Sequence, residues 1–170
     1  GVEQMRQLYI KQKVFSLSEK FTVKDQEEND VYYVEGSFMQ LPKTYTVTNT
    51  AREEVAHITK KTFSLLPKFF VEVGGREVLT IKKEFTFFKS RYTIDATGIE
   101  VIGDWWDMDF EVQKDGEVVG KVRKKWFSWG DSYELEIWQE EMEALLVALV
   151  IAIDCAEADE DNSFVATLGN

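Results

Sequence analysis

Residues 144–153 read Ala-Leu-Leu-Val-Ala-Leu-Val-Ile-Ala-Ile, an unbroken run of apolar side chains. Glu140, Glu141 and Glu143 precede the run, and an acidic first turn complements the positive end of a helix dipole. A helix of this length spans about 15 Å, half of a bilayer core. Because it is apolar on every side, it needs apolar partners around it, and we predict that it is buried inside protein. A strand is the alternative, because Val and Ile favour strands, but the run is longer than most strands.

Residues 8–138, by contrast, alternate between apolar and polar side chains with a period of two. The segment Tyr133 to Ile137 is a clear example, and this period is typical of half-buried strands. Turn sequences separate the alternating runs, among them Gly74-Gly75 and Asp115-Gly116, which tolerate the positive φ angles of tight hairpins. Counting the runs between turns predicts about twelve short strands.

A repeated pattern divides these strands into two similar halves, about residues 7–75 and 77–138. Each copy is a basic-rich strand that ends in an aromatic and a hydroxyl residue, and the four copies are Lys11 to Ser16, Lys60 to Ser64, Lys82 to Thr86 and Lys124 to Ser128. Another aromatic follows each copy: Phe21, Phe69, Tyr92 and Tyr133. A second pattern lies between the two copies of each half, Val34 to Phe38 and Val101 to Trp105.

These features together predict one architecture. An open sheet of twelve strands leaves two exposed edges, which closure into a barrel removes. A twelve-stranded barrel is too wide for its own side chains to fill. We therefore predict a single domain, residues 1–170, in which a closed antiparallel barrel surrounds a central helix at about residues 140–156. The acidic segment 157–170 is then expected to form a solvated tail.

Composition excludes several classes of protein. The 170-residue chain has 44% hydrophobic and 14% aromatic residues, which supports a packed core. Its net charge of −11 argues against a nucleic-acid binder. The single cysteine permits no internal disulfide, so we expect a reducing cytoplasm. We expect neither a secretory leader nor a transmembrane span.

Three motifs, in this order, resemble the LURP-one-related family of tubby-like C-terminal domains: Tyr9 to Ser16, Lys124 to Asp131, and Ala148 to Cys155. The resemblance extends from about Met5 to Ala156 and is nearest to short bacterial members that consist of the domain alone. It implies a twelve-stranded barrel around a hydrophobic helix. Tubby proteins bind phosphoinositide headgroups and the similar scramblases act on phospholipid, but no residue here matches the tubby headgroup site.

The basic doublets are the first candidate for a binding site. Equivalent positions of the repeat carry lysines that could gather into an anion or headgroup patch: Lys60, Lys61, Lys82, Lys83, Lys124 and Lys125. Lys11, Lys13 and Arg123 occupy related positions. The favoured interpretation is nevertheless that these residues solvate outward strand positions and pair with glutamates, because alternation sends one residue of each doublet to the opposite face.

Four other features have a structural interpretation. The loop from Asp104 to Asp109 offers two tryptophans for a membrane interface and three aspartates for a hard cation, but packing at a barrel bend is favoured, because no EF-hand spacing is present. His57 has no metal-binding partner at suitable spacing. Cys155 is interpreted as a buried hydrophobe. Asp154 is expected to be solvated at the helix end.

No catalytic constellation, cofactor motif or metal site emerges from these residues. We therefore expect a non-enzymatic binding or interaction module in the cytoplasm, free or peripheral to the membrane. Phospholipid or phosphoinositide headgroups, or a protein, are its candidate partners. The alternatives are a small-molecule carrier or enzyme with a pocket at a barrel mouth, and a structural or oligomer-forming domain.

Overall fold

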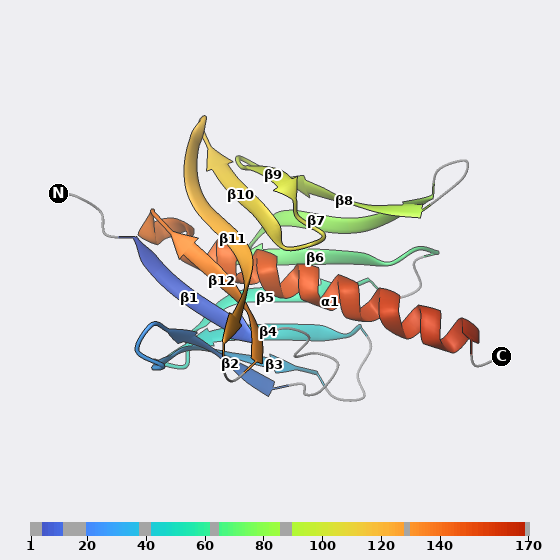
Figure 1. Cartoon of the computed structure of the whole chain (residues 1–170). Coiled ribbons are helices and arrows are strands. Elements are labelled where there is room, and N and C mark those ends of the chain that lie inside the picture. Colours follow the sequence, from blue (N-terminus) through green and yellow to red (C-terminus); the bar gives the residue numbers. More distant parts are fainter. Residues whose placement is uncertain are drawn as a thin grey trace.

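The computed structural model describes residues 5–11, 20–37, 42–61, 65–85, 90–127 and 130–168. Within these ranges the chain forms strands, a short 3-10 helix, η2 (Glu140–Met142), and one α-helix, α1 (Glu143–Leu168) (Figure 1). The first predicted half supplies β1 (Arg6–Lys11), β2 (Lys20–Asp25), β3 (Asp30–Gly36), β4 (Thr44–Asn49), β5 (Glu54–Lys60) and β6 (Lys68–Val73). The second half supplies β7 (Arg76–Phe85), β8 (Ser90–Ala96), β9 (Glu100–Asp104), β10 (Asp109–Lys114), β11 (Glu117–Phe127) and β12 (Gly130–Ile137).

All strands belong to one 12-stranded antiparallel sheet in the order β8-β7-β6-β5-β4-β3-β2-β1-β12-β11-β10-β9. The sheet curls around α1, and β1 pairs with β12, so that the beginning and end of the strand region lie side by side (Figure 1). β8 and β9 stand at the two ends of the order, and the described residues form no ladder between them. The predicted fold class, an antiparallel twelve-stranded barrel around a C-terminal helix, is confirmed, with closure that is nearly complete.

Turn chemistry explains two of the hairpins. Gly74 and Gly75 join β6 to β7 with φ angles of 60° and 79°, and Asp115 and Gly116 join β10 to β11 with 53° and 80°. A type I′ turn requires positive φ at both central residues, and its twist matches that of the flanking strands. These two pairs of residues therefore set the register of their hairpins.

The repeated pattern corresponds to a hairpin. The aromatic residues that follow the four copies lie in the strand after each basic one: Phe21 in β2, Phe69 in β6, Tyr92 in β8 and Tyr133 in β12. Part of the pattern lies outside the described residues, namely 12–16, Phe38, 62–64, Thr86 and Ser128.

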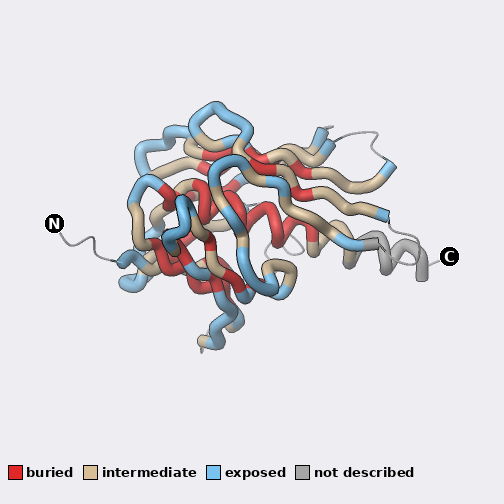
Figure 2. Tube along the Cα trace, turned by 90° about the horizontal axis from the view of Figure 1, so that it is seen from above, coloured by how far each residue is buried: buried red, intermediate tan, exposed pale blue. Residues whose placement is uncertain are grey.

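The core lies between α1 and the inward-facing strand residues. Residues 146–153 of α1 are all 0% exposed, and alternate strand residues such as Leu8, Ile58 and Leu135 are equally buried against them. Figure 2 shows the buried positions concentrated on α1 and on the strand segments around it. Each buried methylene contributes about 0.8 kcal/mol, so this helix is a principal source of stability. No helix among the described residues is long and apolar enough to cross a membrane.

The C-terminal end of α1 differs from the prediction. The helix continues to Leu168 rather than ending near residue 156. Asp159 and Glu160 form ion pairs with Lys60 of β5 and Lys83 of β7. These contacts with the barrel wall stabilise helical turns that hydropathy alone assigns to a solvated tail.

Candidate functional site

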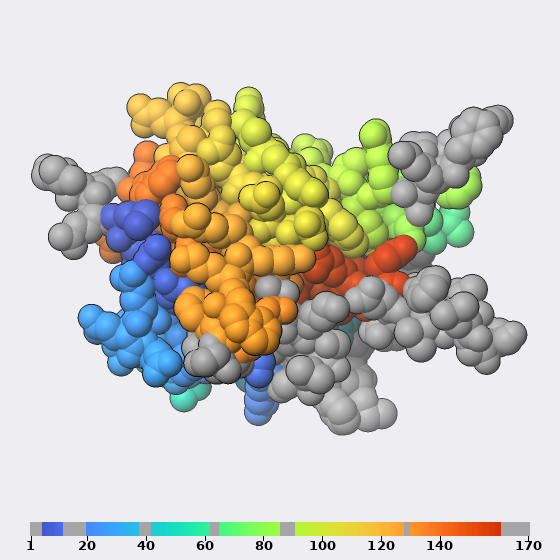
Figure 3. All heavy atoms as spheres, viewed as in Figure 1, coloured from blue at the N-terminus to red at the C-terminus, as the bar shows by residue number. Residues whose placement is uncertain are grey.

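The outer face of β11, β12 and β1 carries an ordered array of polar side chains. Tyr133 and Leu135 of β12 point into the core, so the intervening Glu134 points outward. The strand register places Glu134 between Tyr9 of β1 and Arg123 of β11. Figure 3 shows this face of the barrel, with β1 in dark blue beside the orange β11 and β12.

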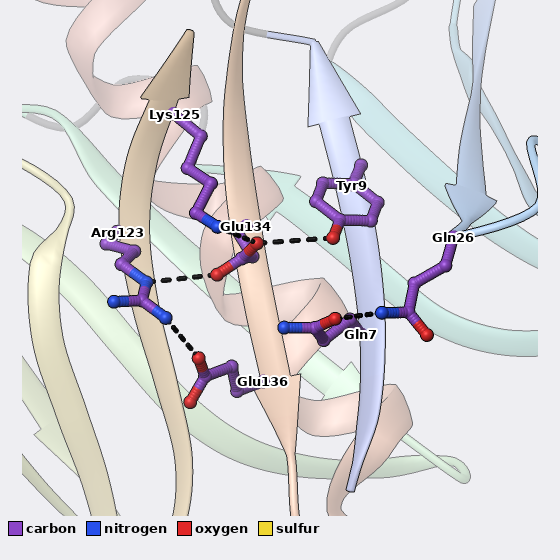
Figure 4. Close-up of polar contacts among 7 residues, drawn as sticks. All are labelled: Gln7, Tyr9, Gln26, Arg123, Lys125, Glu134 and Glu136. Atoms are coloured by element: carbon purple, nitrogen blue, oxygen red, sulfur yellow. Dashed lines mark hydrogen bonds and ion pairs between the residues drawn. The ribbon is translucent and has the colours of Figure 1, made fainter. Parts of the chain in front are cut away.

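Glu134 is buried although it lies on the outer wall. It is 0% exposed, because the side chains of the flanking strands cover it (Figure 4). Its carboxylate accepts hydrogen bonds from Arg123 Nε at 3.0 Å and from Tyr9 OH at 3.2 Å, and it forms an ion pair with Lys125 Nζ at 2.9 Å. Arg123 also binds Glu136. The buried negative charge is therefore held by two cations and a phenol.

The pKa values in this network follow from these contacts. Burial by itself raises the pKa of Glu134, but the hydrogen bonds from Lys125 and Arg123 outweigh burial and leave that pKa below its usual value. Burial and the charge of Glu134 raise the pKa of Tyr9, which keeps its hydroxyl protonated as a donor. Glu134 is therefore a charged anchor for its neighbours and is unsuited to act as a general base near neutral pH.

A groove lies beside this array, where β1 and β2 separate. Among the described residues, β1 and β2 are paired at two positions, Leu8 with Asp25 and Tyr9 with Lys24. Beyond that point a groove of about 680 Å³ opens, which we call the outer-wall groove. Its lining combines aromatic, cationic, acidic and uncharged polar side chains: Tyr9, Lys11, Phe21, Thr22, Lys24, Asp25, Gln26, Glu28 and Phe127.

Two lysines, on the strands to either side of β12, lie next to the outer-wall groove. Lys11 of β1 and Lys125 of β11 both stand opposite Ser132 of β12, one on each side. Strands lie about 4.8 Å apart, so the two lysine backbones are about 10 Å apart. Lys11 makes no ion pair with another described residue, and the Tyr9 and Phe127 rings meet edge to face at 5.3 Å beside it. Such an arrangement can receive an anionic group next to an aromatic surface.

The six doublet lysines are not brought together in one patch. Lys60 and Lys83 point inward to Asp159 and Glu160 of α1, and Lys125 points outward to Glu134. Two more pair locally, Lys82 with Glu84 at 3.3 Å and Lys124 with Asp107 at 3.0 Å. Lys61 makes no ion pair with another described residue. The anion-binding role of this set stays a prediction.

The aromatic loop packs at the barrel wall. Trp105 and Trp106 are partly buried against the core, and Trp106 stacks on Tyr92 with ring centroids 4.4 Å apart. No group of three or more His, Cys, Asp or Glu residues capable of holding a metal ion occurs in the part of the chain that the structure describes. The favoured interpretation of this loop, packing at a bend, agrees with these contacts.

The three remaining candidates have different outcomes. His57 contacts Glu54 at 3.1 Å and Thr46 at 3.3 Å on the barrel exterior. Cys155 is buried, and burial raises the pKa of its thiol, which suits the expected hydrophobic role. The expected solvation of Asp154 is wrong: its side chain is buried and accepts a hydrogen bond from Tyr133 OH at 2.8 Å, because α1 continues past it through the barrel.

Sequence reasoning missed Glu134 as the centre of a site. The alternation in residues 133–137 predicts that Glu134 lies on the polar face. The sequence does not predict its burial, because the side chains that cover it come from β1 and β11, which are far from each other along the chain.

Comparisons with known proteins agree with this fold. A family model described as LURP-one-related matches residues 6–154. The uncharacterized protein YxjI of Bacillus subtilis is 36% identical over 160 residues, which cover 94% of this chain and 99% of that protein. A solved structure of an Arabidopsis thaliana protein has a TM-score of 0.63 at 15% identity, covering 92% of this chain and 93% of that one. The structural likeness concerns the fold alone.

Proposed function

This chain belongs to the LURP-one-related family, and we propose that it is a non-enzymatic binding module for anionic amphiphiles of the phospholipid class. The outer-wall groove is the binding site. The single observation that carries the proposal is that this 680 Å³ groove combines an aromatic lining with Lys11, a lining cation that forms no ion pair with another described residue. Ligand sites of this size combine apolar walls with a few placed polar groups.

The barrel interior is filled, so a ligand must bind at the outer wall or at the rims. Because α1 occupies the barrel with fully buried side chains, a ligand has no lumen to enter. The outer-wall groove, in contrast, opens where the β1–β2 ladder stops. A ligand there needs no displacement of the core.

The chemistry of the groove suits a headgroup and its attached apolar part. Lys11 offers an ammonium group to a phosphate, and Lys125, which already holds Glu134, adds positive charge on the other side of Ser132. Tyr9 and Phe127 provide ring surface against which the glycerol and first methylenes pack. Of the six predicted doublet lysines, Lys125 is the one beside this groove. The other four that form ion pairs do so away from it: Lys60, Lys82, Lys83 and Lys124.

Net charge restricts how this binding works. At −11 the chain is repelled by an anionic bilayer at long range. Binding must therefore come from contacts within the groove, and we expect the protein to lie at a membrane surface only while the groove is occupied. The dependence on salt should be shallow, because few phosphates are contacted.

Vesicle flotation tests the proposal. We expect the protein to float with vesicles of phosphatidylcholine and phosphatidylglycerol, and to float less with phosphatidylcholine alone. Lys11→Glu should abolish the difference between the two vesicles. Lys114→Glu is the matched control, because Lys114 is exposed at the β10–β11 turn and gives the same change in charge; flotation of this variant should match the wild type.

A second pair of variants tests the groove rather than the charge. Thr22→Trp places a large ring in the groove and should block flotation, whereas Thr80→Trp, on the outer face of β7, should not. Equal flotation of all four variants and the wild type, or no flotation of the wild type, would refute lipid binding in this groove.

One observation favours a second candidate, a carrier or enzyme with a pocket at a barrel mouth. A hollow of about 430 Å³ lies where α1 begins, and Arg6, Glu140 and Glu143 are among its lining residues. Arg6 and Glu143 already form an ion pair at 3.3 Å, and Tyr32 OH binds Glu143, so these groups face each other. Glu140→Lys at this mouth should leave vesicle flotation unchanged if the outer-wall groove is the site.

A further inference from the structure

A hollow different from the one where α1 begins lies at the other end of the barrel, at the seam between β8 and β9. It has a volume of about 380 Å³ and lies at the rim where α1 leaves the barrel. Tyr92 of β8 stacks on Trp106 of the turn after β9, at 4.4 Å and 16°, and Trp105 meets Trp106 edge to face at 5.8 Å. Aromatic side chains thus bridge the seam that no backbone ladder closes among the described strands.

A carboxylate of the chain itself already occupies one side of this hollow. Both oxygens of Glu160, on α1, accept hydrogen bonds from Lys83 Nζ, at 2.7 and 3.0 Å, and Tyr92 OH donates a third at 3.2 Å. The Lys83 side chain is only 17% exposed, whereas that of Glu160 is 39% exposed. The donors are therefore fixed in the wall, and the carboxylate is on the accessible side. In Figure 3 the red surface of α1 emerges beside the yellow and green surface of this seam.

The donor set is suited to anions. Burial, together with the charges of Glu160 and Asp159, raises the pKa of Tyr92, so its hydroxyl remains a donor near neutral pH. Arg91 also lines the hollow and makes no ion pair with another described residue. A guanidinium beside an ammonium and a phenol presents donors to both oxygens of a carboxylate or sulfonate.

We propose that this seam hollow binds a small aromatic anion, and that Glu160 holds the place of the ligand's carboxylate. The ligand's acid group takes the hydrogen bonds of Lys83 and Tyr92 and gains Arg91, while its ring packs against Trp105 and Trp106. Glu160 is released into water, where its charge is well solvated. A volume of about 380 Å³ is near the lower end for ligand pockets, so the ligand has one or two rings. This site is separate from the outer-wall groove and does not depend on it.

Calorimetric titration with 2-naphthoate, and with its uncharged analogue 2-naphthamide, tests the proposal. The wild-type protein should bind naphthoate and quench tryptophan fluorescence, while naphthamide should bind more weakly. Glu160→Gln removes the competing carboxylate. Because partly exposed ion pairs are weak, we expect its removal to raise the naphthoate affinity by roughly two- to fivefold. Arg91→Gln should reduce the affinity by a similar factor.

Two matched controls separate this mechanism from a general effect of charge. Asp159→Asn removes an equal charge from the neighbouring Lys60 ion pair, and Arg76→Gln removes an equal charge at the opposite rim. Arg76→Gln should bind naphthoate as the wild type does, and Asp159→Asn, whose charge also acts on Tyr92, should gain less affinity than Glu160→Gln. The proposal is overturned if neither the wild type nor Glu160→Gln binds naphthoate, if Asp159→Asn gains as much affinity as Glu160→Gln, or if naphthamide binds as tightly as naphthoate.

Discussion

Gly120 of β11 lies directly against α1, and an added methyl group there tests the packing of helix and barrel. An ideal Cβ at Gly120 would stand 2.5 Å from Leu146 Cδ1 and 3.0 Å from both Leu146 Cδ2 and the Glu136 carbonyl oxygen. Carbon atoms in contact normally lie about 3.5–4.0 Å apart, so the leucine must move by about 1 Å. Leu146 is 0% exposed, so its side chain can move only against other buried groups.

Two opposing effects set the size of the change. Overpacking a filled core costs about 1–3 kcal/mol. Replacing glycine by alanine at an ordinary φ angle stabilises by about 0.4–1 kcal/mol through the unfolded chain, and Gly120 is outside the positive-φ region. The cost of overpacking is larger than the gain from replacing glycine. We therefore expect Gly120→Ala to lower the free energy of unfolding by about 1–2 kcal/mol.

A double-mutant cycle identifies Leu146 as the cause. Leu146→Ala alone should cost about 2–5 kcal/mol, because it leaves a cavity in the core. In the double variant the new methyl group enters that cavity, so the total loss should be smaller than the sum of the single losses by about 1–3 kcal/mol. Gly75→Ala is the control, because its φ of 79° is strained for alanine but no atom lies within 4 Å of its added Cβ.

Urea unfolding, followed by circular dichroism and tryptophan fluorescence, measures these free energies, provided that the m-value stays constant. Gly75→Ala should be destabilised by about 1–2 kcal/mol, whatever residue stands at position 146. A neutral Gly120→Ala, or strict additivity between Gly120→Ala and Leu146→Ala, would refute the packing of α1 against β11 described above.

Three further predictions concern buried polar groups and the thiol. Tyr133→Phe removes a 2.8 Å hydrogen bond to buried Asp154 and should cost about 1–3 kcal/mol in urea unfolding, whereas the partly exposed Tyr33→Phe should be nearly neutral; equal losses would contradict the buried contact. The pKa of Glu134 is lower in the folded state than its ordinary 4.5, so its contribution to stability is complete above that pH and lost as the pH falls through the folded pKa. Glu134→Gln should therefore flatten the acid side of the stability profile, and an unchanged profile would count against the network. The Cys155 thiol, buried and with a raised pKa, should react with Ellman's reagent only after unfolding, and rapid reaction of the native protein would place it at the surface.

The residue pattern was sufficient for the architecture because local rules govern it. Period-two alternation gave the strands, and the glycine pairs gave the hairpins at Gly74-Gly75 and Asp115-Gly116. The ten-residue apolar run predicted a buried helix, because a helix that is apolar on every side must be covered by apolar partners. The inner face of the barrel is the only predicted surface large enough to cover it. These inferences depend on neighbours in sequence, and the structure agrees with each of them.

The candidate sites depend on contacts that the sequence could not reveal. Glu134 is buried by Tyr9, 125 positions away, and Glu160 receives hydrogen bonds from Lys83, 77 positions away. The ion pairs of Asp159 and Glu160 also lengthen α1 beyond its apolar run.

The sequence by itself therefore determined the barrel, its number of strands and the helix inside it, because alternation and hydrophobic burial are properties of neighbouring residues. Only the tertiary structure decided which lysines form ion pairs with other described residues, and where the wall opens. These outcomes depend on strand register and on closure, which bring together charges and rings from opposite ends of the chain.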